Sequence, residues 1–444
     1  MRRSVAIVVA AAMLSVTLAS CGGERSAGPS EGRVTVTFWH SFVSGTIPAL
    51  RQMIARFEEE HPHIRINAQY IPTGDALVQK LITSVQSNTA PDVSWVRAHY
   101  MHEMVKADAI YQMSHFIDGP NGLSDEELDD FYPSLLQYAS WQGTLYSIPM
   151  EATNLGLLYN KGHFREVGLD PDRPPRTWDE LREYARRLSR DLNGNGRYDR
   201  VGFAVPAVPA TGPNGSYMSW TFFPWLWQSG AELVNEDQTR IILDEPEAIR
   251  ALSFWKELYE MQQLQNFTND WMVAFTSKQA AMIMDGPWNL PRYDRMLGDI
   301  DWGIAMLPEG PVTRATIVGG EYLAIFKQSD VPDETWEFVK WVTRPDIQAW
   351  WAMESGYLPV RKSSMDDPEY AAFLEENPGH KAFADQMAFA LAQRPLDYET
   401  VAIQRLMAEA LEKAMVGGQD PETVFREAAS RGTELLLAAK RAER

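Results

Sequence analysis

Residues 34–70, VTVTFWHSFVSGTIPALRQMIARFEEEHPHIRINAQY, decide the fold of this chain. Apolar residues alternate with threonines over the first five positions, which predicts a strand, and they recur at helical spacing over 47–57. A His-Pro pair at 61–62 ends that helix, and the alternation returns over 64–70. A strand, a helix and a second strand in this order form a βαβ unit, which implies a parallel sheet covered by helices.

The same pattern continues with a helical stretch from Asp75 to Ser87 and a strand from Asp92 to Val96. Ligands of open α/β sheets bind beyond the carboxyl ends of the strands. Two such ends and the start of the helix carry polar or aromatic side chains. We therefore take as candidate ligand-binding residues Trp39, His40, Ser41, Asp75 and Arg97.

The composition indicates a globular, acidic protein. The chain has 444 residues, with 41 Lys and Arg against 60 Asp and Glu, and a formal charge of −19. This balance argues against a nucleic-acid partner, because such binders carry basic surfaces that displace counterions from phosphates. A hydrophobic content of 45%, with 15 Trp, 16 Tyr and 18 Phe, supplies enough material for burial and argues against disorder. The length suggests about two to three domain-sized cores.

The N-terminus has the pattern of a bacterial lipoprotein signal. Two arginines precede an apolar run over 5–16, and LASC at 18–21 is similar to a lipobox, in which the cysteine is acylated. We expect residues 1–20 to be removed, Cys21 to carry lipid, and residues 21–32 to form a flexible tether. The protein would then be anchored to the membrane on its extracytoplasmic face, in a periplasm or at the cell surface. A plain secretory signal with an incidental cysteine is the alternative.

Short motifs along the chain resemble the family 1 extracellular solute-binding proteins of ABC importers, in the branch that binds oligosaccharides, sugars and glycerol phosphate. No single motif is diagnostic, but their order and spacing over roughly 33–440 match the family. The motifs are FWHSF at 38–42, APDV at 90–93, LYNK at 158–161, GLDP at 168–171, TWDEL at 177–181, AM at 281–282, GPW at 286–288, GG at 319–320 and GYLP at 356–359.

The resemblance implies an α/β, two-lobed periplasmic-binding-protein fold of type II, similar to maltose-binding protein, with a hinge and a central ligand cleft. Such a protein is expected to work as a monomer. Glycines at two of the three crossings fit segments that change φ and ψ when the lobes close. The implied N-terminal lobe comprises 33–147 and 320–352, the C-terminal lobe comprises 150–318 and 357–444, and the crossings fall near 147–151, 318–321 and 355–358.

Sugar binders need aromatic planes for the C–H faces of the ligand and fixed polar groups for its hydroxyls. Aromatic residues in turn-like or strand-end contexts are therefore candidates: Trp39, Trp225, Trp227, Trp288 and Tyr357. The polar and backbone candidates around the crossings and the GPW motif are Glu151, Thr153, Asn154, Gln228, Asp285, Gly286, Gly320, Glu321 and Tyr322. A core position for any one tryptophan, and a solvated surface position for Glu151 or Asp285, are the alternatives.

The segment DLNGNGRYD at 191–199 is similar to the first nine positions of an EF-hand loop. It offers oxygens from Asp191, Asn193, Asn195, the Arg197 carbonyl and Asp199 to a structural Ca²⁺. The bidentate glutamate of that loop is missing, because position 12 is a glycine. An Asn/Gly-rich turn without metal is the alternative.

These residues leave three functions open. The first is a non-enzymatic, lipid-anchored receptor that captures a neutral sugar or oligosaccharide and delivers it to the transmembrane subunits of an ABC importer, with no required cofactor. The second keeps the importer but replaces the ligand by glycerol 3-phosphate or a glycerophosphodiester; carboxylates in the cleft argue against it. The third is a surface-anchored glycoside hydrolase, with Glu151 and either Asp285 or Glu321 as its two carboxylates.

Overall fold

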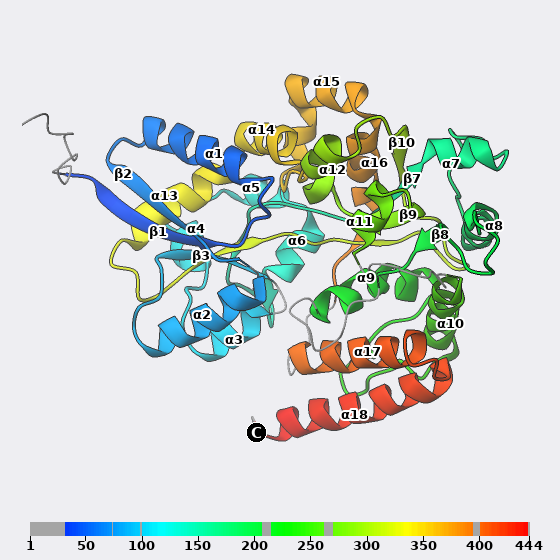
Figure 1. Cartoon of the computed structure of the whole chain (residues 1–444). Helices are drawn as coiled ribbons and strands as arrows, with labels where there is room; N and C mark the ends of the chain where they lie inside the picture. The colour runs from blue at the N-terminus through cyan, green and yellow to red at the C-terminus, as the bar shows by residue number, and fades with distance from the viewer. Residues whose placement is uncertain are drawn as a thin grey trace, which may run out of the picture.

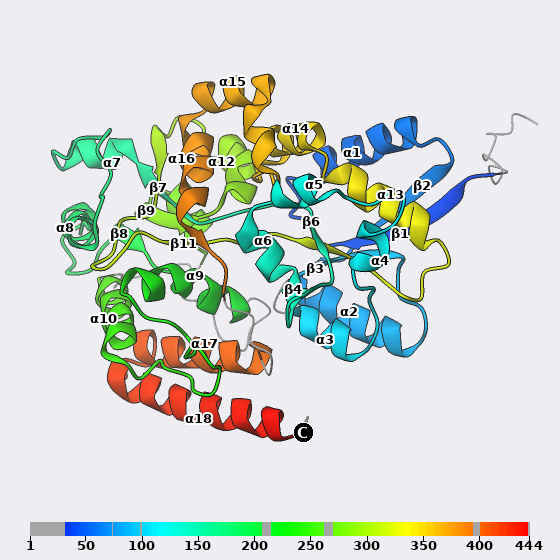
Figure 2. The same cartoon turned by 180° about the vertical axis from the view of Figure 1, so that it is seen from behind.

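The computed structural model describes residues 32–72, 74–97, 100–206, 215–261, 270–393 and 400–442. In it the chain forms two α/β halves, each built on its own sheet and covered by helices (Figures 1 and 2). The chain passes between the halves three times, so both are assembled from segments far apart in sequence.

The first sheet has the strand order β2-β1-β3-β12-β6. Its strands are β1 (Val34–His40), β2 (Ile64–Tyr70), β3 (Val93–Val96), β6 (Ile148–Pro149) and β12 (Tyr322–Ile325). β1 pairs in parallel with both β2 and β3, and helix α1 (Ile47–Glu60) connects β1 to β2. The predicted βαβ unit is confirmed, and its parallel pairing places the ends of β1 and β3 side by side.

Helices cover this sheet and bury its apolar side chains (Figure 1). They are α2 (Gly74–Gln86), α3 (Met101–Lys106), α4 (Ser114–Ile117), α5 (Asp125–Asp129), α6 (Pro133–Tyr138), α13 (Pro332–Val342) and α14 (Pro345–Ser355), with a small hairpin of β4 (Ser140–Trp141) and β5 (Thr144–Leu145). Trp336 and Trp341 on α13 are buried, as their helical spacing predicts.

The second sheet has the strand order β10-β7-β9-β8. Its strands are β7 (Gly156–Asn160), β8 (Val201–Ala204), β9 (Ala280–Asp285) and β10 (Trp302–Ala305). The helices of this half are α7 (Lys161–Glu166), α8 (Trp178–Leu188), α9 (Gly215–Gln228), α10 (Pro246–Glu260), α11 (Trp271–Thr276), η2 (Pro287–Asn289), α12 (Leu290–Met296), α17 (Thr400–Met415) and α18 (Pro421–Ala442). α17 and α18 pack against α10 along one side of the half (Figures 1 and 2).

Residues 317–326 (IVGGEYLAIF) have an apolar, strand-like pattern interrupted by two glycines, and in the structure they divide between two sheets. β11 (Thr316–Ile317) pairs with β13 (Ala390–Leu391), whereas β12 belongs to the first sheet. Gly320, between them, has φ of +147°, and a Cβ there would lie 2.0 Å from the Glu151 carbonyl oxygen. The glycine is required because the second crossing runs directly against the first.

The three crossings are hydrogen bonded to one another. Met150 N donates to the Glu321 carbonyl at 2.9 Å, and Thr153 and Gly319 exchange two backbone bonds. Ala152 exchanges two more with Leu358, at 2.9 and 2.8 Å. This narrow three-stranded waist joins the two halves. The exact lobe boundaries stay a prediction.

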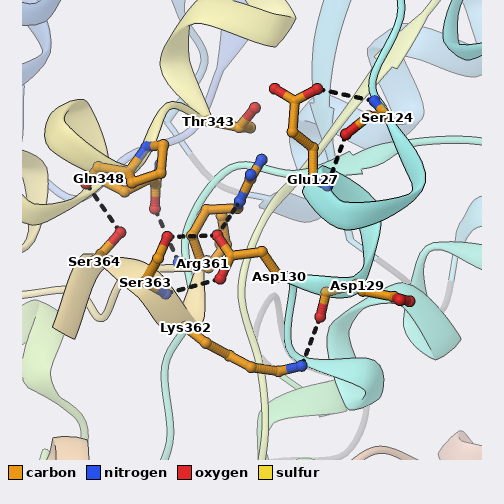
Figure 3. Close-up of polar contacts among 12 residues, drawn as sticks. Ser124, Glu127, Asp129, Asp130, Thr343, Gln348, Arg361, Lys362, Ser363 and Ser364 are labelled. Carbon is orange, nitrogen blue, oxygen red and sulfur yellow. Dashed lines mark hydrogen bonds and ion pairs between the residues drawn. The ribbon is translucent and has the colours of Figure 1, made fainter. Parts of the chain in front are cut away.

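The segment after the third crossing continues through η3 (Lys362–Asp366), α15 (Pro368–Glu376), α16 (Pro378–Gln386) and η4 (Met387–Phe389). Its first residues are attached to the loop between α5 and α6 (Figure 3). Arg361 Nε donates to Asp130 Oδ2 at 2.7 Å, and Ser363 donates to both carboxylate oxygens of Asp130. The Arg361 guanidinium also lies 4.6 Å from the centre of the Phe131 ring. This ion pair between a buried arginine and a half-buried aspartate fixes the chain beyond the third crossing to the first half.

We predict that Asp130→Ala lowers the free energy of unfolding by about 3–5 kcal/mol, because it leaves the buried Arg361 charge without its carboxylate. Urea unfolding followed by tryptophan fluorescence measures the change. Asp244→Ala is the control: it breaks an exposed pair with Arg240 and should cost no more than about 1 kcal/mol. Equal losses in the two variants would contradict the structural role of the Asp130 pair.

Candidate functional site

A cavity of about 330 Å³ lies between the halves, at the waist. The loop after β1, the end of β3 and all three crossings contribute to its wall, together with α6, α9, α11, η2 and the start of α17. The lining residues are Ser41, Val43, Trp95, Arg97, Tyr138, Thr153, Tyr217, Trp220, Trp271, Trp288, Asn289, Gly319, Gly320, Glu321, Tyr322, Tyr357, Gln393 and Gln404. A volume of this size suits a small organic molecule.

Eight of the residues predicted from the sequence line this cavity: Ser41, Arg97, Thr153, Trp288, Gly320, Glu321, Tyr322 and Tyr357. Ser41 and Arg97 follow the carboxyl ends of two parallel neighbours, which is where the strand-end rule places a ligand. The others come from the crossings or the GPW motif. The structure thus brings together residues separated by more than half the chain.

Trp39 and His40 do not line the cavity, because both are still inside β1. Trp39 faces α2, where Lys80 Nζ lies 3.8 Å from its ring centre. His40 is buried on the opposite face beside Phe42, and burial lowers its pKa to about 4. The side chain of Asp75, in the first turn of α2, lies outside the described residues.

Three candidates on α9 are corrected by the structure. Trp225, Trp227 and Gln228 were expected in a turn, but 215–228 is a helix that contains Pro224. Trp225 is fully buried against Trp255, and Trp227 is buried too. Gln228 accepts from Trp178 Nε1 at 2.6 Å and donates to the Ala315 carbonyl at 2.7 Å, so it is part of the core of the second half.

The N-terminal part of the same helix reaches the cavity through Tyr217 and Trp220, which the sequence analysis missed. Their i, i+3 spacing could have identified them as a pair, since it places both on one face of a helix. Trp220 and Trp288 rings lie 5.9 Å apart and are tilted by 58°. Tyr217 stacks on Trp271, with ring centres 5.1 Å apart. These four rings give the cavity one predominantly aromatic wall.

Asp285 and Gly286 support this wall and do not line the cavity. Asp285 accepts hydrogen bonds from Gly286 N, from Asn289 Nδ2 and, at 2.6 Å, from Tyr293 OH. Burial raises the pKa of Asp285 to about 6. A Cβ on Gly286 would lie 1.7 Å from the Trp288 ring, so the glycine leaves room for that ring to fold back over the backbone. The pair orients the GPW turn and with it Trp288.

Asn154 is likewise a structural residue. Its side chain is fully buried, donates to the Phe383 carbonyl at 2.9 Å and accepts from Gln386 Nε2 at 2.9 Å. It therefore connects the first crossing to α16. The further lining residues that sequence reasoning missed are Val43, Trp95, Tyr138, Trp271, Asn289, Gly319, Gln393 and Gln404. Trp95 could have been found, because it lies at the end of β3 next to Arg97.

The prediction of Glu151 as a ligand-binding residue is also corrected, because its side chain is fully buried and does not line the cavity. Its Oε2 accepts from Trp351 Nε1 at 3.1 Å. Glu321 does line the cavity, and the two carboxyls lie within hydrogen-bond reach of each other. Burial raises the pKa of Glu151 well above its ordinary value, and the hydrogen bond and charge of Glu321 raise it further. Of this pair, Glu321 is the residue that can reach a ligand.

Several polar atoms around the cavity are buried without a hydrogen-bond partner in the described part of the chain. They are Ser41 Oγ, Trp95 Nε1, Thr153 Oγ1, Tyr217 OH, Trp271 Nε1, Tyr322 OH and Glu321 Oε2. Buried polar groups are normally bonded, and leaving each one unpaired costs about 1–3 kcal/mol. Donors and acceptors gathered in one cavity and facing aromatic rings can bind a ligand that has both hydroxyl groups and apolar faces.

The 191–199 segment is an exposed loop held by its own side chains. Asp191 accepts from the backbone N–H groups of Gly194, Asn195 and Gly196, and Asp199 accepts from Leu192 N at 2.6 Å. The other predicted oxygens also face backbone: Asn193 Oδ1 accepts from Asn195 N, and Asn195 Oδ1 accepts from Arg197 N. Within the described ranges no three His, Cys, Asp or Glu side chains form a group suited to a metal. Calcium binding stays a prediction.

If this loop binds calcium with a Kd near 10⁻⁵ M, then 5 mM CaCl₂ is about 500 times that Kd and raises the melting temperature above that in EDTA, by mass action on the native state. Differential scanning fluorimetry measures this shift. Asp191→Ala should abolish it, whereas Asp172→Ala, at an exposed carboxylate paired with Lys161, should leave it intact. Identical melting temperatures in calcium and EDTA would identify the loop as a metal-free turn.

Comparison with known proteins adds independent findings. Residues 52–382 match the model of a family described as bacterial extracellular solute-binding protein. The sn-glycerol-3-phosphate-binding periplasmic protein UgpB of Escherichia coli K12 is 25% identical over 432 residues, which cover 92% of this chain and 94% of that protein.

Solved structures match over nearly the whole chain as well. The cyclic α-maltosyl-1,6-maltose binding protein of Arthrobacter globiformis has a TM-score of 0.77 and 26% identity, covering 91% of this chain and 99% of that one. UgpB of Mycobacterium tuberculosis, solved with glycerophosphocholine, has a TM-score of 0.78 and 24% identity, covering 92% and 100%. The α/β periplasmic-binding-protein fold expected from the sequence is confirmed.

Proposed function

The chain belongs to the bacterial extracellular solute-binding proteins, and on this premise we propose that it captures a neutral sugar or oligosaccharide for an ABC importer. The observation that carries the proposal is the cavity at the waist, where aromatic rings lie beside buried polar atoms that have no partner in the described residues. Sugar hydroxyls would pair with these atoms while the C–H faces of the ring lie against the tryptophans.

The family is one of binding proteins and not of enzymes, which sets aside the glycoside hydrolase alternative. The site geometry agrees with this, because two of the three carboxylates considered for hydrolysis, Glu151 and Asp285, lie outside the cavity lining. Capture would depend on contacts from both halves: a ligand held by both stabilises the arrangement in which they are close.

Relatives bind either sugars or glycerol phosphates, and the charges of this cavity favour the former. Arg97 is the one Lys or Arg among the described lining residues. Its charge acts on Glu321, whose pKa it lowers against the raising effect of burial. Glu321 therefore already balances Arg97, and a phosphate would enter a site with no surplus positive charge next to a carboxylate. A neutral polyol meets no such penalty.

Lipid anchoring completes the proposal. Cys21 and the rest of residues 1–31 lie outside the described residues. In the part of the chain that the structure describes, no helix has the length and apolar character needed to cross a bilayer. We propose that Cys21 attaches the protein to the membrane on the extracytoplasmic side, where it meets the transmembrane subunits of the importer as a monomer, without nucleic acid.

Ligand class can be tested by titrating the protein with maltose, trehalose and glycerol 3-phosphate and following tryptophan fluorescence. A neutral sugar should bind and glycerol 3-phosphate should not. Trp288→Ala should weaken sugar binding by about 1–3 kcal/mol, because it removes one aromatic contact. Trp350→Ala is the control. The Trp350 ring lies outside the cavity lining and contacts the Arg56 guanidinium, so the substitution should leave sugar affinity unchanged. Binding of glycerol 3-phosphate alone would refute the sugar ligand but not the family.

Anchoring predicts that Cys21→Ser releases the protein from membranes or blocks its processing, since the serine hydroxyl cannot take the place of the acylated thiol. Detergent-phase partitioning of wild type and variant measures the change. Ser20→Ala, which keeps a small residue before the cysteine, is the matched control and should stay in the detergent phase. Unchanged partitioning of Cys21→Ser would mean that the signal is a plain secretory one.

A further inference from the structure

Glu151 occupies the centre of the waist, where the three crossings meet. Its backbone lies in the first crossing, with its carbonyl oxygen against Gly320 of the second. Its carboxyl is fully buried and faces groups from the other two: Glu321 from the second, Tyr357 from the third, and Trp351 from α14 just before the third. One side chain thus contacts all the segments that join the halves.

The two carboxyls, Glu151 and Glu321, cannot both be satisfied as anions. Glu151 Oε1 and Glu321 Oε2 are buried and receive no hydrogen bond from any donor in the described residues. The two side chains nevertheless lie within hydrogen-bond reach of each other. A single proton shared by the pair removes the repulsion and lets one carboxyl donate a hydrogen bond to the other.

The neighbouring charges decide which carboxyl keeps that proton. Burial raises the pKa of Glu321 above its ordinary value, and the hydrogen bond with Glu151 and the charge of Arg97 only partly oppose this. Burial, and after it the hydrogen bond and charge of Glu321, raise the pKa of Glu151 well above its ordinary value, and the hydrogen bonds from Trp351 and Tyr357 only partly oppose this. Tyr357 also stays protonated, because burial and both carboxylates raise its pKa. Glu151 is therefore the proton carrier and Glu321 the anion.

We propose that Glu151 is a positioning residue whose protonated carboxyl donates to Glu321, orients that carboxylate into the cavity and ties the three crossings together, so that alkaline ionisation of Glu151 loosens the waist. The part of this inference that concerns ligand affinity rests on the proposed function. The part that concerns the waist does not.

The sign of the pH dependence follows from linkage. The pKa of Glu151 is higher in the folded chain than in the unfolded chain, so the folded state binds the extra proton. The stability that this proton confers is complete below the unfolded pKa and is lost as pH rises through the folded pKa. Each pH unit in that window changes the unfolding equilibrium by up to about tenfold.

The first test measures thermal unfolding of the ligand-free protein from pH 6.5 to 9. Wild type should lose stability as pH rises. Glu151→Gln, whose amide donates to Glu321 without a titratable proton, should fold and show a flat profile. Asp285→Asn is the matched control: it removes another buried carboxyl whose pKa is raised, to about 6, so the wild-type loss of stability at the alkaline end of the window should remain. A Glu151→Gln profile as steep as wild type would overturn the proposal.

A second variant tests the same proton without changing either carboxyl. Trp351→Phe removes a donor that favours ionised Glu151, so it should shift the alkaline loss of stability to higher pH. Trp336→Phe, which removes a donor to the Asn121 carbonyl in the first half, should lower stability without moving the pH midpoint. Equal midpoints in wild type and Trp351→Phe would contradict the assignment of the proton to Glu151.

Binding of maltose over the same pH range then tests the orientation of Glu321. Wild-type affinity should fall as pH rises, Glu151→Gln should hold its affinity, and Glu321→Gln should bind more weakly at every pH. An affinity that falls equally in wild type and Glu151→Gln would overturn the positioning role. If maltose binds to none of these proteins, the proposed ligand is wrong, while the ligand-free unfolding profiles still decide whether Glu151 holds the proton.

Discussion

The close backbone contact between Glu151 and Gly320 is the constraint on which the rest of the structure depends. There is no room for a Cβ atom at residue 320. Because glycine has none, the second crossing can run directly beside the first, which also pairs with the third. The same contact brings Glu321 to the cavity and turns Glu151 away from it. Site, hinge and charge arrangement therefore have one geometric origin, and a larger residue at 320 would disturb all three.

The waist also explains why the cavity is lined by both aromatic rings and unpaired polar atoms. Each half buries its own aromatic core, as Trp225 and Trp255 do in the second half, and those rings have no surface to offer a ligand. Between the halves the packing stops, and side chains such as Tyr217 and Trp220 are left facing a space that protein atoms do not fill. The unpaired hydrogen-bonding atoms that face this space can be satisfied by a ligand, which would offset the cost of burying them.

Local pattern was sufficient to predict much of the fold. The alternation of β1 and β2 around α1 gave the parallel sheet, and the ends of β1 and β3 located Ser41 and Arg97 correctly. It could not show which side of an extended crossing faces the cavity, so Glu151 was taken for a ligand group. Nor could it identify the helix that spans 215–228, because proline and glycine there suggested turns. Gln393 and Gln404 carry no local signal, since tertiary packing alone brings them to the site.

The insertion of β12 between β3 and β6 has a consequence for how the chain acquires this structure. Val96 pairs with Tyr322, and Ile148 pairs with Leu323, so the first sheet lacks an internal strand until much of the second half has been synthesised. An N-terminal fragment would expose the unpaired edge of β3, and pairings this distant in sequence form slowly because loop closure must precede them. A chain built in this way cannot complete its first sheet until residues 322–325 have been made, and this delay suits a polypeptide that must thread through a secretion channel before it folds on the other side.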